Sequence, residues 1–373
     1  MDPCGYKWIG LDSGFKSRRG HKISNKMKNN IKEMEMIETI KKYPGMCEKA
    51  VKIAENVSLP DYKFNNIIVC GMGGSAIVGD LLKDLLIDKI SIPIEVSREY
   101  NLPAYADEDT LVLCVSYSGD TEETLSQFVD AIEKKCKIIG ITSGGKLKEW
   151  CNKFNLPCIL ILGGYQPRVA LPYLFFTALM CLQKLNLIDL TKDIEETIKV
   201  LKGMGVANIK KIVSSLKNSI PVIYASNEFS GVAKRIKTQF NENSKVPAKH
   251  DVFPELDHNE IVGYQNKKLN KNHFVIILRD KEEAEEIKTR IEVSKKLIKS
   301  KCKGIYEIWT QGKSKLSKIM SLVYIGDILS YELAIMNKTD PEKTENISIL
   351  KKDLKKRLNL VEKLEKRLTN FSV

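Results

Sequence analysis

Histidine is scarce in this sequence, with four residues among 373, and metal-binding cysteine motifs are missing. The nine cysteines form no CxxC pair and no cysteine–histidine cluster with the spacing of a zinc site. They are scattered through apolar contexts and their number is odd, so a disulfide framework is not expected either. We interpret them as reduced core thiols of a cytosolic protein, and we expect neither a metal nor a cofactor.

Long apolar runs are also missing. No uninterrupted run approaches the ~20 residues that span a membrane. The basic N-terminus lacks the apolar stretch and the cleavage site of a secretory signal. We therefore expect a cytoplasmic protein with no membrane partner. Residues 1–30 are expected to be a disordered or artefactual extension, with Met27 or Met34 as alternative starts.

The net charge of +13 is concentrated at the two ends of the chain. Residues 1–32 carry eight Lys or Arg and two Asp, a charge of +6, and residues 351–373 carry eight Lys or Arg and three acids, a charge of +5. The remaining 318 residues are close to neutral, at about +2. Neither end interleaves aromatic residues as a base-stacking surface does, so nucleic-acid binding is not expected.

Between these ends, short apolar strands alternate with helical patterns, which is typical of parallel sheets built from β–α–β units. In the first half, strands are predicted at 65–70, 92–97, 110–116, 137–143 and 158–164, and helices at 75–87, 121–135 and 171–185. After a polar helical segment the alternation resumes, with strands at 221–226, 274–280 and 304–310 and helices at 228–242, 281–300 and 315–336.

The predicted fold class is α/β, with two mostly parallel sheets flanked by helices. An earlier helical pattern begins near residue 30 and precedes the first strand. We place the two domains at 31–190 and 191–350. A basic helix is expected at 351–373, with one apolar face formed by Leu358, Val361, Leu364 and Leu368.

The stretch GMGGSA, residues 71–76, follows the first predicted strand and opens a helix. A glycine turn between a strand and a helix is typical of an anion-binding loop. It departs from the dinucleotide fingerprint GxGxxG only at Ala76, but no Asp or Glu closes the second strand. The Gly-Lys-Ser/Thr sequence of a Walker A loop is missing as well. An ordinary turn that needs a positive φ angle is the alternative.

A second loop, SYSGDTEETL at residues 116–125, lies at the carboxyl end of the third strand and opens the next helix. Gly119 allows a tight backbone, and the turn contains three hydroxyl side chains, Ser116, Ser118 and Thr121. Together with the free N–H groups of the helix, these hydroxyls predict a phosphate cradle that needs neither lysine nor metal. The alternative is an ordinary capping box, with Asp120 as the N-cap and Glu123 three residues later.

These two loops, in this order, resemble the phosphosugar-binding loops of the sugar isomerase (SIS) fold. That resemblance implies that Gly74 and Ser75 help to bind the substrate, although Ser75 could equally cap the helix. QFNENSKVPAKHDVFPELDHNEIVG at 239–263 and TDPEKTENISILKKDL at 339–354 resemble the bifunctional phosphoglucose/phosphomannose isomerases. Members of this family consist of two SIS domains, and the resemblance covers roughly residues 35–354.

The resemblance implies a metal-independent aldose-ketose isomerase. It would interconvert glucose 6-phosphate or mannose 6-phosphate with fructose 6-phosphate through an enediol or enediolate. By resemblance, Glu242 in NENSK is the base that moves the proton, and a base works best when its pKa lies near the working pH. His258 in FPELDHNE is implied to open the sugar ring. In the family this histidine reaches the site of the neighbouring subunit, so a homodimer is expected, and nearby carboxylates favour its protonated form.

Three further positions follow from the resemblance. Arg168 in GGYQPRVALPY is implied to steady negative charge on the enediolate. A cation close to a helix start is disfavoured by the macrodipole, so Arg168 is expected to have a ligand or a carboxylate partner. Lys351 is implied to approach the same site, although Lys352 beside it leaves the match open. Thr344 is associated with room for either configuration at carbon 2.

Two alternatives stay open at this point. The SIS fold also serves regulators, so the chain could be a non-catalytic phosphosugar-binding protein. Such a regulator would need the phosphate loop but not Glu242 and His258 together, and no helix-turn-helix or other effector domain is evident. The chain could also act on another phosphosugar or an aminosugar phosphate, a choice that depends on details of the pocket.

Overall fold

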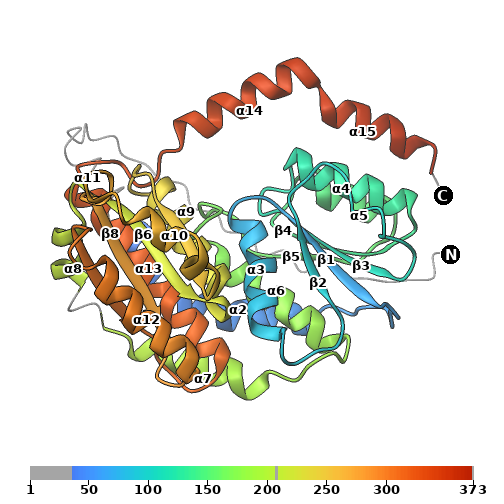
Figure 1. The fold of residues 1–373 in the computed structure, drawn as a ribbon. Coiled ribbons are helices and arrows are strands. Elements are labelled where there is room, and N and C mark those ends of the chain that lie inside the picture. Colours follow the sequence, from blue (N-terminus) through green and yellow to red (C-terminus); the bar gives the residue numbers. More distant parts are fainter. Residues whose placement is uncertain (1–35, 206–208, 372–373) are drawn as a thin grey trace, which may run out of the picture.

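The computed structural model describes residues 36–205 and 209–371 of the chain. Figure 1 shows two sheets side by side, each flanked by helices, with the C-terminal helices passing over both. The predicted extension at residues 1–30 lies outside the described residues. The first helical pattern is described from Met36 onward and includes helix α2 (Tyr43–Glu55).

All strand pairs in both sheets are parallel, which confirms the predicted fold class. The first sheet has the order β2-β1-β3-β4-β5 and the second the order β7-β6-β8-β9. The strands of the first sheet are β1 (Asn66–Cys70), β2 (Ile94–Ser97), β3 (Thr110–Val115), β4 (Lys137–Thr142) and β5 (Cys158–Leu160). Those of the second are β6 (Ile220–Ser226), β7 (Lys249–Phe253), β8 (His273–Arg279) and β9 (Gly304–Trp309).

The two sheets share one topology. In each, the chain leaves the first strand for a neighbour on one side and then crosses to the other side, so β1 and β6 occupy equivalent places, as do β3 and β8. The duplication that the sequence did not show as a repeat is therefore visible in the strand order.

The remaining elements are helices, and most of those predicted are present. In the first half they are α3 (Gly74–Leu86), α4 (Glu122–Glu133), α5 (Gly145–Lys153) and α6 (Leu171–Lys184). The polar segment before the second alternation forms α7 (Thr191–Gly203) and α8 (Ile209–Leu216). In the second half they are η1 (Asn227–Phe229), α9 (Ser230–Glu242), η2 (Glu255–His258), α10 (Glu260–Gly263), α11 (Lys267–Asn270), α12 (Glu285–Ile298), α13 (Lys315–Met336), α14 (Glu345–Leu358) and α15 (Leu360–Thr369).

Three differences from the prediction have local causes. β7 is an edge strand that was not predicted, because its residues Lys249 to Asp251 are polar and show no apolar run. α5 was not predicted either, since it has only three buried residues. β5 ends at Leu160, whereas the strand was predicted to run to residue 164, where Gly164 turns the chain with a φ of 90°.

One hydrophobic core joins the two halves. In β1, Ile67 and Val69 face this shared core, whereas Ile68 and Cys70 face α4 and α5. The shared core also contains residues of β6 and β8 from the second sheet, and helices α2, α3, α6, α7, α9 and α13 supply most of its remaining side chains. The halves are therefore distinct as sheets, but they are packed as one body around these helices.

Helix α13 lies in this shared core. Its 22 residues are long and apolar enough to cross a membrane by length and composition alone. However, 78% of its most apolar window is buried inside the protein. The length and apolarity of α13 are therefore accounted for by its burial in the second half.

The C-terminal region differs from the single basic helix that was predicted at 351–373. Helix α14 already begins at Glu345, and the left-handed backbone of Asn359 (φ 44°) separates it from α15. Helix α14 buries no residue, whereas α15 packs Leu364 and Leu368 against α4. Leu358 does not share that buried face because it belongs to α14, and it is exposed. Figure 1 shows α14 spanning from the second half to the first, where α15 docks.

Candidate active site

The SYSGDT loop forms a tight turn between β3 and α4. Ser116 Oγ is buried, lies 3.0 Å from Thr121 Oγ1 and accepts a hydrogen bond of 3.1 Å from the Gly119 amide. Ser118 is exposed, and its Oγ accepts a hydrogen bond of 3.2 Å from the Asp120 amide. Gly119 is required because its φ is 75° and a Cβ there would lie 1.8 Å from the carbonyl oxygen of Gly144.

The capping-box alternative for this loop is wrong. The N-cap of α4 is Thr121, and its side chain makes no capping hydrogen bond. The Asp120 carboxylate instead accepts a hydrogen bond of 3.0 Å from the Lys146 amide at the start of α5. The N–H groups in the first turn of α4 are thus left without a side-chain cap, as an anion-binding helix end requires.

The glycine turn lies beside this loop. Gly73 is the N-cap of α3, so Ser75 is not the cap, and Ser75 Oγ accepts a hydrogen bond of 3.3 Å from the Tyr117 amide. A Cβ on Gly74 would lie 3.3 Å from the Cα atom of Arg168, so this glycine permits a close approach of the two segments. Because β1 and β3 are neighbours with helices leaving in opposite directions, both helix N-termini meet at the topological switch point of the sheet.

Arg168 is the cation next to this switch point, and only 3% of the residue is exposed. Its Nε donates a hydrogen bond of 2.6 Å to Asn243 Oδ1, and its Nη2 donates to the carbonyl oxygens of Pro341 and Glu342 at 2.5 and 3.1 Å. Its Nη1 lies 3.7 Å from Glu242 Oε2. Burial lowers the pKa of Arg168, and Glu242 opposes that shift. The expected carboxylate partner of Arg168 is therefore present.

Glu242 is the last residue of α9, as the sequence predicted, and its side chain is 25% exposed. It lines a cavity of about 490 Å³ together with Lys245, Asp340 and Thr344. Thr344 is the N-cap of α14. The candidate base and the candidate specificity residue therefore border the same cavity, and Arg168 lies between Glu242 and the glycine turn at Gly74.

A buried polar network supports Arg168 from the second half. Arg235 donates hydrogen bonds of 3.1 and 2.8 Å to Asp327, and it also donates to the carbonyl oxygen of Arg168. Tyr43 donates a hydrogen bond of 2.6 Å to the same aspartate. Burial opposes ionisation, but Asp327 holds the pKa of Arg235 above its ordinary value. The sequence analysis missed this network because its members come from α2, α9 and α13, and no local pattern joins them.

His258 lies apart from these groups in this chain. It ends η2, is exposed, and makes no hydrogen bond or ion pair with another candidate residue in the described part of the chain. The carboxylates near it in sequence are bound to other groups. Asp257 contacts Arg290 and Ser294, and Glu260 pairs with Lys249 at 2.8 Å.

Lys351 lies on α14, which spans from the second half to the first. Burial and Glu123 raise the pKa of Glu122 at the start of α4, and Lys355 and Lys351 oppose this rise. Lys351 and Lys355 are four residues apart and so share one face of α14. The positive charges of both lysines therefore act on a carboxylate in the first turn of α4, next to Thr121.

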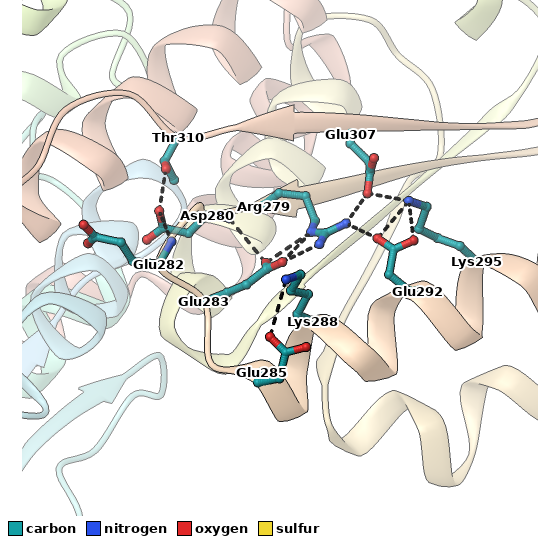
Figure 2. A network of polar contacts seen from close by, with 10 residues as sticks. All are labelled: Arg279, Asp280, Glu282, Glu283, Glu285, Lys288, Glu292, Lys295, Glu307 and Thr310. Atoms are coloured by element: carbon teal, nitrogen blue, oxygen red, sulfur yellow. Dashed lines mark hydrogen bonds and ion pairs between the residues drawn. The ribbon is translucent and has the colours of Figure 1, made fainter.

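The corresponding edge of the second sheet is occupied by ion pairs, as Figure 2 shows. Arg279 ends β8, the strand equivalent to β3, and its guanidinium pairs with Glu283, Glu292 and Glu307. The loop that follows, RDKEE, is acidic where the first sheet carries hydroxyls. Where the first sheet carries the candidate phosphate loop, the described residues of the second sheet thus carry ion pairs.

Among residues 36–205 and 209–371, no group of three or more His, Cys, Asp or Glu side chains is arranged to hold a metal ion. The eight cysteines in the same ranges are all free, as predicted, and six are buried.

Comparison with known proteins identifies the family. Residues 62–149 match the model of the SIS domain, and residues 206–354 match that of the bacterial phospho-glucose isomerase C-terminal SIS domain. The chain is 42% identical over 334 residues to the bifunctional phosphoglucose/phosphomannose isomerase of Caldicellulosiruptor bescii, covering 86% of this chain and 98% of that protein. The chain belongs to the bifunctional phosphoglucose/phosphomannose isomerase family.

Other members of this family are also similar over most of their length. The bifunctional phosphoglucose/phosphomannose isomerase of Aquifex aeolicus is 35% identical over 298 residues, which cover 79% of this chain and 91% of that protein. A D-glucosamine-6-phosphate 4-epimerase of Sulfolobus acidocaldarius is 33% identical over 270 residues, covering 71% and 81%.

Solved structures support the fold. The C-terminal domain of glucosamine-fructose-6-phosphate aminotransferase from Francisella tularensis aligns with a TM-score of 0.65 at 14% identity, over 83% of this chain and 98% of that one. Glucosamine-6-phosphate deaminase from Thermotoga maritima aligns with a TM-score of 0.61 at 17% identity, over 85% and 97%. At these identities the likeness shows a common fold and nothing about the reaction.

Proposed function

We propose that this chain interconverts glucose 6-phosphate, mannose 6-phosphate and fructose 6-phosphate by moving a proton between carbons 1 and 2 of the sugar. The observation that carries the proposal is the Arg168–Glu242 pair, set between the two phosphate loops and the cavity that Thr344 borders. Family members at 42% and 35% identity carry both isomerase activities in their names.

In the proposed complex the first sheet holds the phosphate. The hydroxyls of Ser118 and Thr121 and the uncapped N–H groups of α4 contact its oxygens, while Ser75 borders it from α3. Ser116 is buried and bonded within the loop, so it shapes the cradle from beneath. Lys351, rather than Lys352, adds positive charge, because it shares the face of α14 that acts on Glu122.

The carboxylate of Glu242 removes the proton from carbon 2 of the aldose and returns it to carbon 1 to give the ketose. The guanidinium of Arg168 stabilises the negative charge of the enediolate between these two steps. Because aldose and ketose have the same composition, the reaction needs no oxidant, reductant or second substrate. Room beside Thr344 accepts either configuration at carbon 2, so the same base serves glucose and mannose phosphates.

Ring opening requires a proton donor, and we assign it to His258 of a second copy of the chain in a cytoplasmic homodimer. In its own chain His258 is exposed and makes no contact with the other candidate residues described. Asp257, next to His258 in the chain, borders a groove of about 290 Å³ whose lining includes the apolar residues Ile261, Val293 and Leu297. Val293 and Leu297 are 50% and 53% exposed, which suits a face covered by another subunit.

A second candidate function is a different reaction on an aminosugar phosphate. The 33% identity to D-glucosamine-6-phosphate 4-epimerase favours it, although the isomerases of Caldicellulosiruptor bescii and Aquifex aeolicus are more similar, at 42% and 35%, and are covered more completely. Epimerisation at carbon 4 would convert fructose 6-phosphate to neither glucose 6-phosphate nor mannose 6-phosphate, so one assay separates the two functions.

The test is to incubate the purified protein with fructose 6-phosphate in EDTA and to measure glucose 6-phosphate and mannose 6-phosphate. Both products are expected, and Glu242→Gln should lower both rates about 10²- to 10⁴-fold, the usual contribution of a general base. Formation of one product alone would show that the protein does not have the dual specificity. Binding of fructose 6-phosphate without either product would support a regulator instead.

A further inference from the structure

Lys245 follows α9 by three residues and has a left-handed backbone, with a φ of 53°. Its ammonium group donates hydrogen bonds to three carbonyl oxygens, those of Glu242 at 2.8 Å, Asn243 at 3.3 Å and Asp340 at 2.6 Å. An ammonium group has three N–H donors, so all of them are used. Lys245 thus contacts only backbone acceptors, although it borders the same cavity as Glu242 and Thr344.

Two of these bonds fix the end of α9. The last carbonyl groups of a helix have no partner within the helix, and a lysine near the C-terminus satisfies them and offsets the macrodipole. The carbonyls that Lys245 binds are those of Glu242 itself and of the next residue. Fixing them fixes the backbone from which the Glu242 carboxylate extends toward Arg168.

The third bond ties this helix end to the segment that leads into α14. The carbonyl of Asp340 accepts from Lys245, and those of Pro341 and Glu342 accept from Arg168. Three successive carbonyls are therefore held by two cations. Thr344 begins α14 two residues later, so its position depends on how this segment is held.

We infer that Lys245 is a positioning residue that sets Glu242 and Thr344 relative to each other and so controls both turnover and the ratio of glucose to mannose product. This inference rests on the proposed function. Lys245 is not placed at the reacting carbons, and its hydrogen bonds go to backbone carbonyls and not to a catalytic side chain. It acts through the backbone of α9 and of residues 340–342.

Two other lysines show that a left-handed backbone alone does not give a lysine the hydrogen bonds that Lys245 makes. Lys135 and Lys338 also have positive φ angles, of 59° and 57°, after helices. Lys135 follows α4 and makes no side-chain contact like that of Lys245 in the described part of the chain. Lys135→Met is therefore a matched control for the loss of a lysine from a left-handed position.

The experiment compares Lys245→Met, Lys245→Gln and Lys135→Met, using the full chain with fructose 6-phosphate as substrate. For Lys245→Met we expect kcat to fall about 10- to 100-fold, as a small misplacement of a catalytic group does, with KM changed less. We also expect the ratio of glucose 6-phosphate to mannose 6-phosphate to change. Glutamine has an amide N–H donor, so Lys245→Gln should give a kcat and a product ratio between those of Lys245→Met and the wild type. Lys135→Met should match the wild type in both.

The product ratio is the decisive measurement, because a protein that is merely less stable makes the same ratio from its folded fraction. A lower melting temperature with unchanged kcat per folded molecule and an unchanged ratio would overturn the inference. If Lys245→Met does not fold, Lys245→Gln supplies the same two measurements. Failure of the proposed function is separate, since the wild-type protein would then form neither product.

Discussion

At the scale of single residues, Arg168 organises segments that are far apart in the sequence. Its side chain binds Asn243 and the carbonyls of residues 341 and 342, and its own carbonyl accepts a hydrogen bond from Arg235. A guanidinium group is a rigid plane with five N–H donors. In Arg168, Nε and Nη2 are hydrogen-bonded as described, and Nη1 lies beside Glu242. This rigid arrangement is what a group needs to stabilise charge that appears only in the transition state.

Ser118 gives the first prediction at this scale. It is exposed in the loop proposed to hold phosphate, so Ser118→Ala should remove a hydrogen bond to a charged ligand. Such a bond contributes about 1.5–3 kcal/mol, and we expect KM for fructose 6-phosphate to rise roughly 10- to 100-fold. The melting temperature should stay close to that of the wild type. Ser91→Ala, at another exposed serine, is the control, and an unchanged KM in Ser118→Ala would place the phosphate elsewhere.

The second prediction for a single residue concerns Asp84. Asp84 lies on α3, is 7% exposed, and accepts a hydrogen bond of 2.7 Å from the Gly231 amide near the start of α9. Burial raises the pKa of Asp84 to about 8; the Gly231 amide and Lys315 oppose this rise, and Asp80 adds to it. In the unfolded chain an aspartate has a pKa of about 3.9. Between these values unfolding releases a proton, so rising pH favours the unfolded state.

The contribution of Asp84 to stability is therefore greatest at about pH 4, is lost progressively up to about pH 8, and is constant above that. An asparagine side chain cannot ionise, so Asp84→Asn should remove this loss of stability with rising pH. We expect the variant to exceed the wild type in free energy of unfolding by up to a few kcal/mol at about pH 8.5, with no such excess at about pH 4. Urea unfolding at both pH values measures the free energy of unfolding, and Asp61→Asn, at an exposed aspartate, is the control. A difference independent of pH would contradict the expected titration.

At the scale of elements, the two sheets show how one topology takes different roles. The loop after β3 carries hydroxyls and a glycine with positive φ, whereas β8 ends in Arg279 and an acidic loop. The guanidinium of Arg279 also stacks over the Trp309 ring at 4.8 Å. The same edge of the sheet thus carries the candidate phosphate loop in the first half and a network of internal ion pairs in the second.

Arg279→Met tests the structural role of this network (Figure 2). The Arg279 side chain is 2% exposed, and its removal leaves Glu283, which is 7% exposed, without its cation. Removing one partner of a buried pair typically costs about 3–5 kcal/mol, so the free energy of unfolding should fall by that order. KM and kcat should be unchanged below the unfolding transition. Lys288→Met, which breaks an exposed pair on α12, should cost at most about 1 kcal/mol, and equal losses in the two variants would contradict this role.

At the scale of the whole molecule, the candidate site needs both halves of the chain. The two candidate phosphate loops and Arg168 come from the first half, whereas Glu242 and Thr344 come from the second. The shared core holds the halves together, and α15 adds a further contact through Arg367, which donates hydrogen bonds of 3.0 and 2.7 Å to Glu133. A site divided in this way depends on the docking of the two halves.

The proposed dimer makes a prediction that a monomer cannot meet. Glu242→Gln and His258→Ala are each expected to be inactive as homodimers. After the two are mixed and allowed to exchange subunits, a heterodimer has one site with both changes and one site with neither. Isomerase activity should therefore return, to about a quarter of wild type for random exchange into closed two-fold dimers. Light scattering on the mixture checks the oligomeric state, and a dimeric mixture that stays inactive would place His258 in its own chain's site.

The sequence alone predicts the alternation of strands and helices, the two glycine- and hydroxyl-containing turns that open α3 and α4, and the order of the motifs. These features follow from the period of apolar residues and from the backbone freedom of glycine, which act over a few neighbouring residues. For the same reason the edge strand β7 was missed, because half-buried polar residues give no apolar period. The break at Asn359, which divides the predicted C-terminal helix, was missed because asparagine is left-handed only in some contexts.

Which side chains meet depends on the tertiary structure. The bonds of Arg168 to Asn243, Pro341 and Glu342 join residues separated by 75, 173 and 174 positions. Lys245 and Arg235 show no local pattern that distinguishes them from surface cations, and Asp120 forms a link to α5 where a helix cap was considered. Such contacts depend on how two sheets pack around a shared core, and that packing is a property of the whole chain.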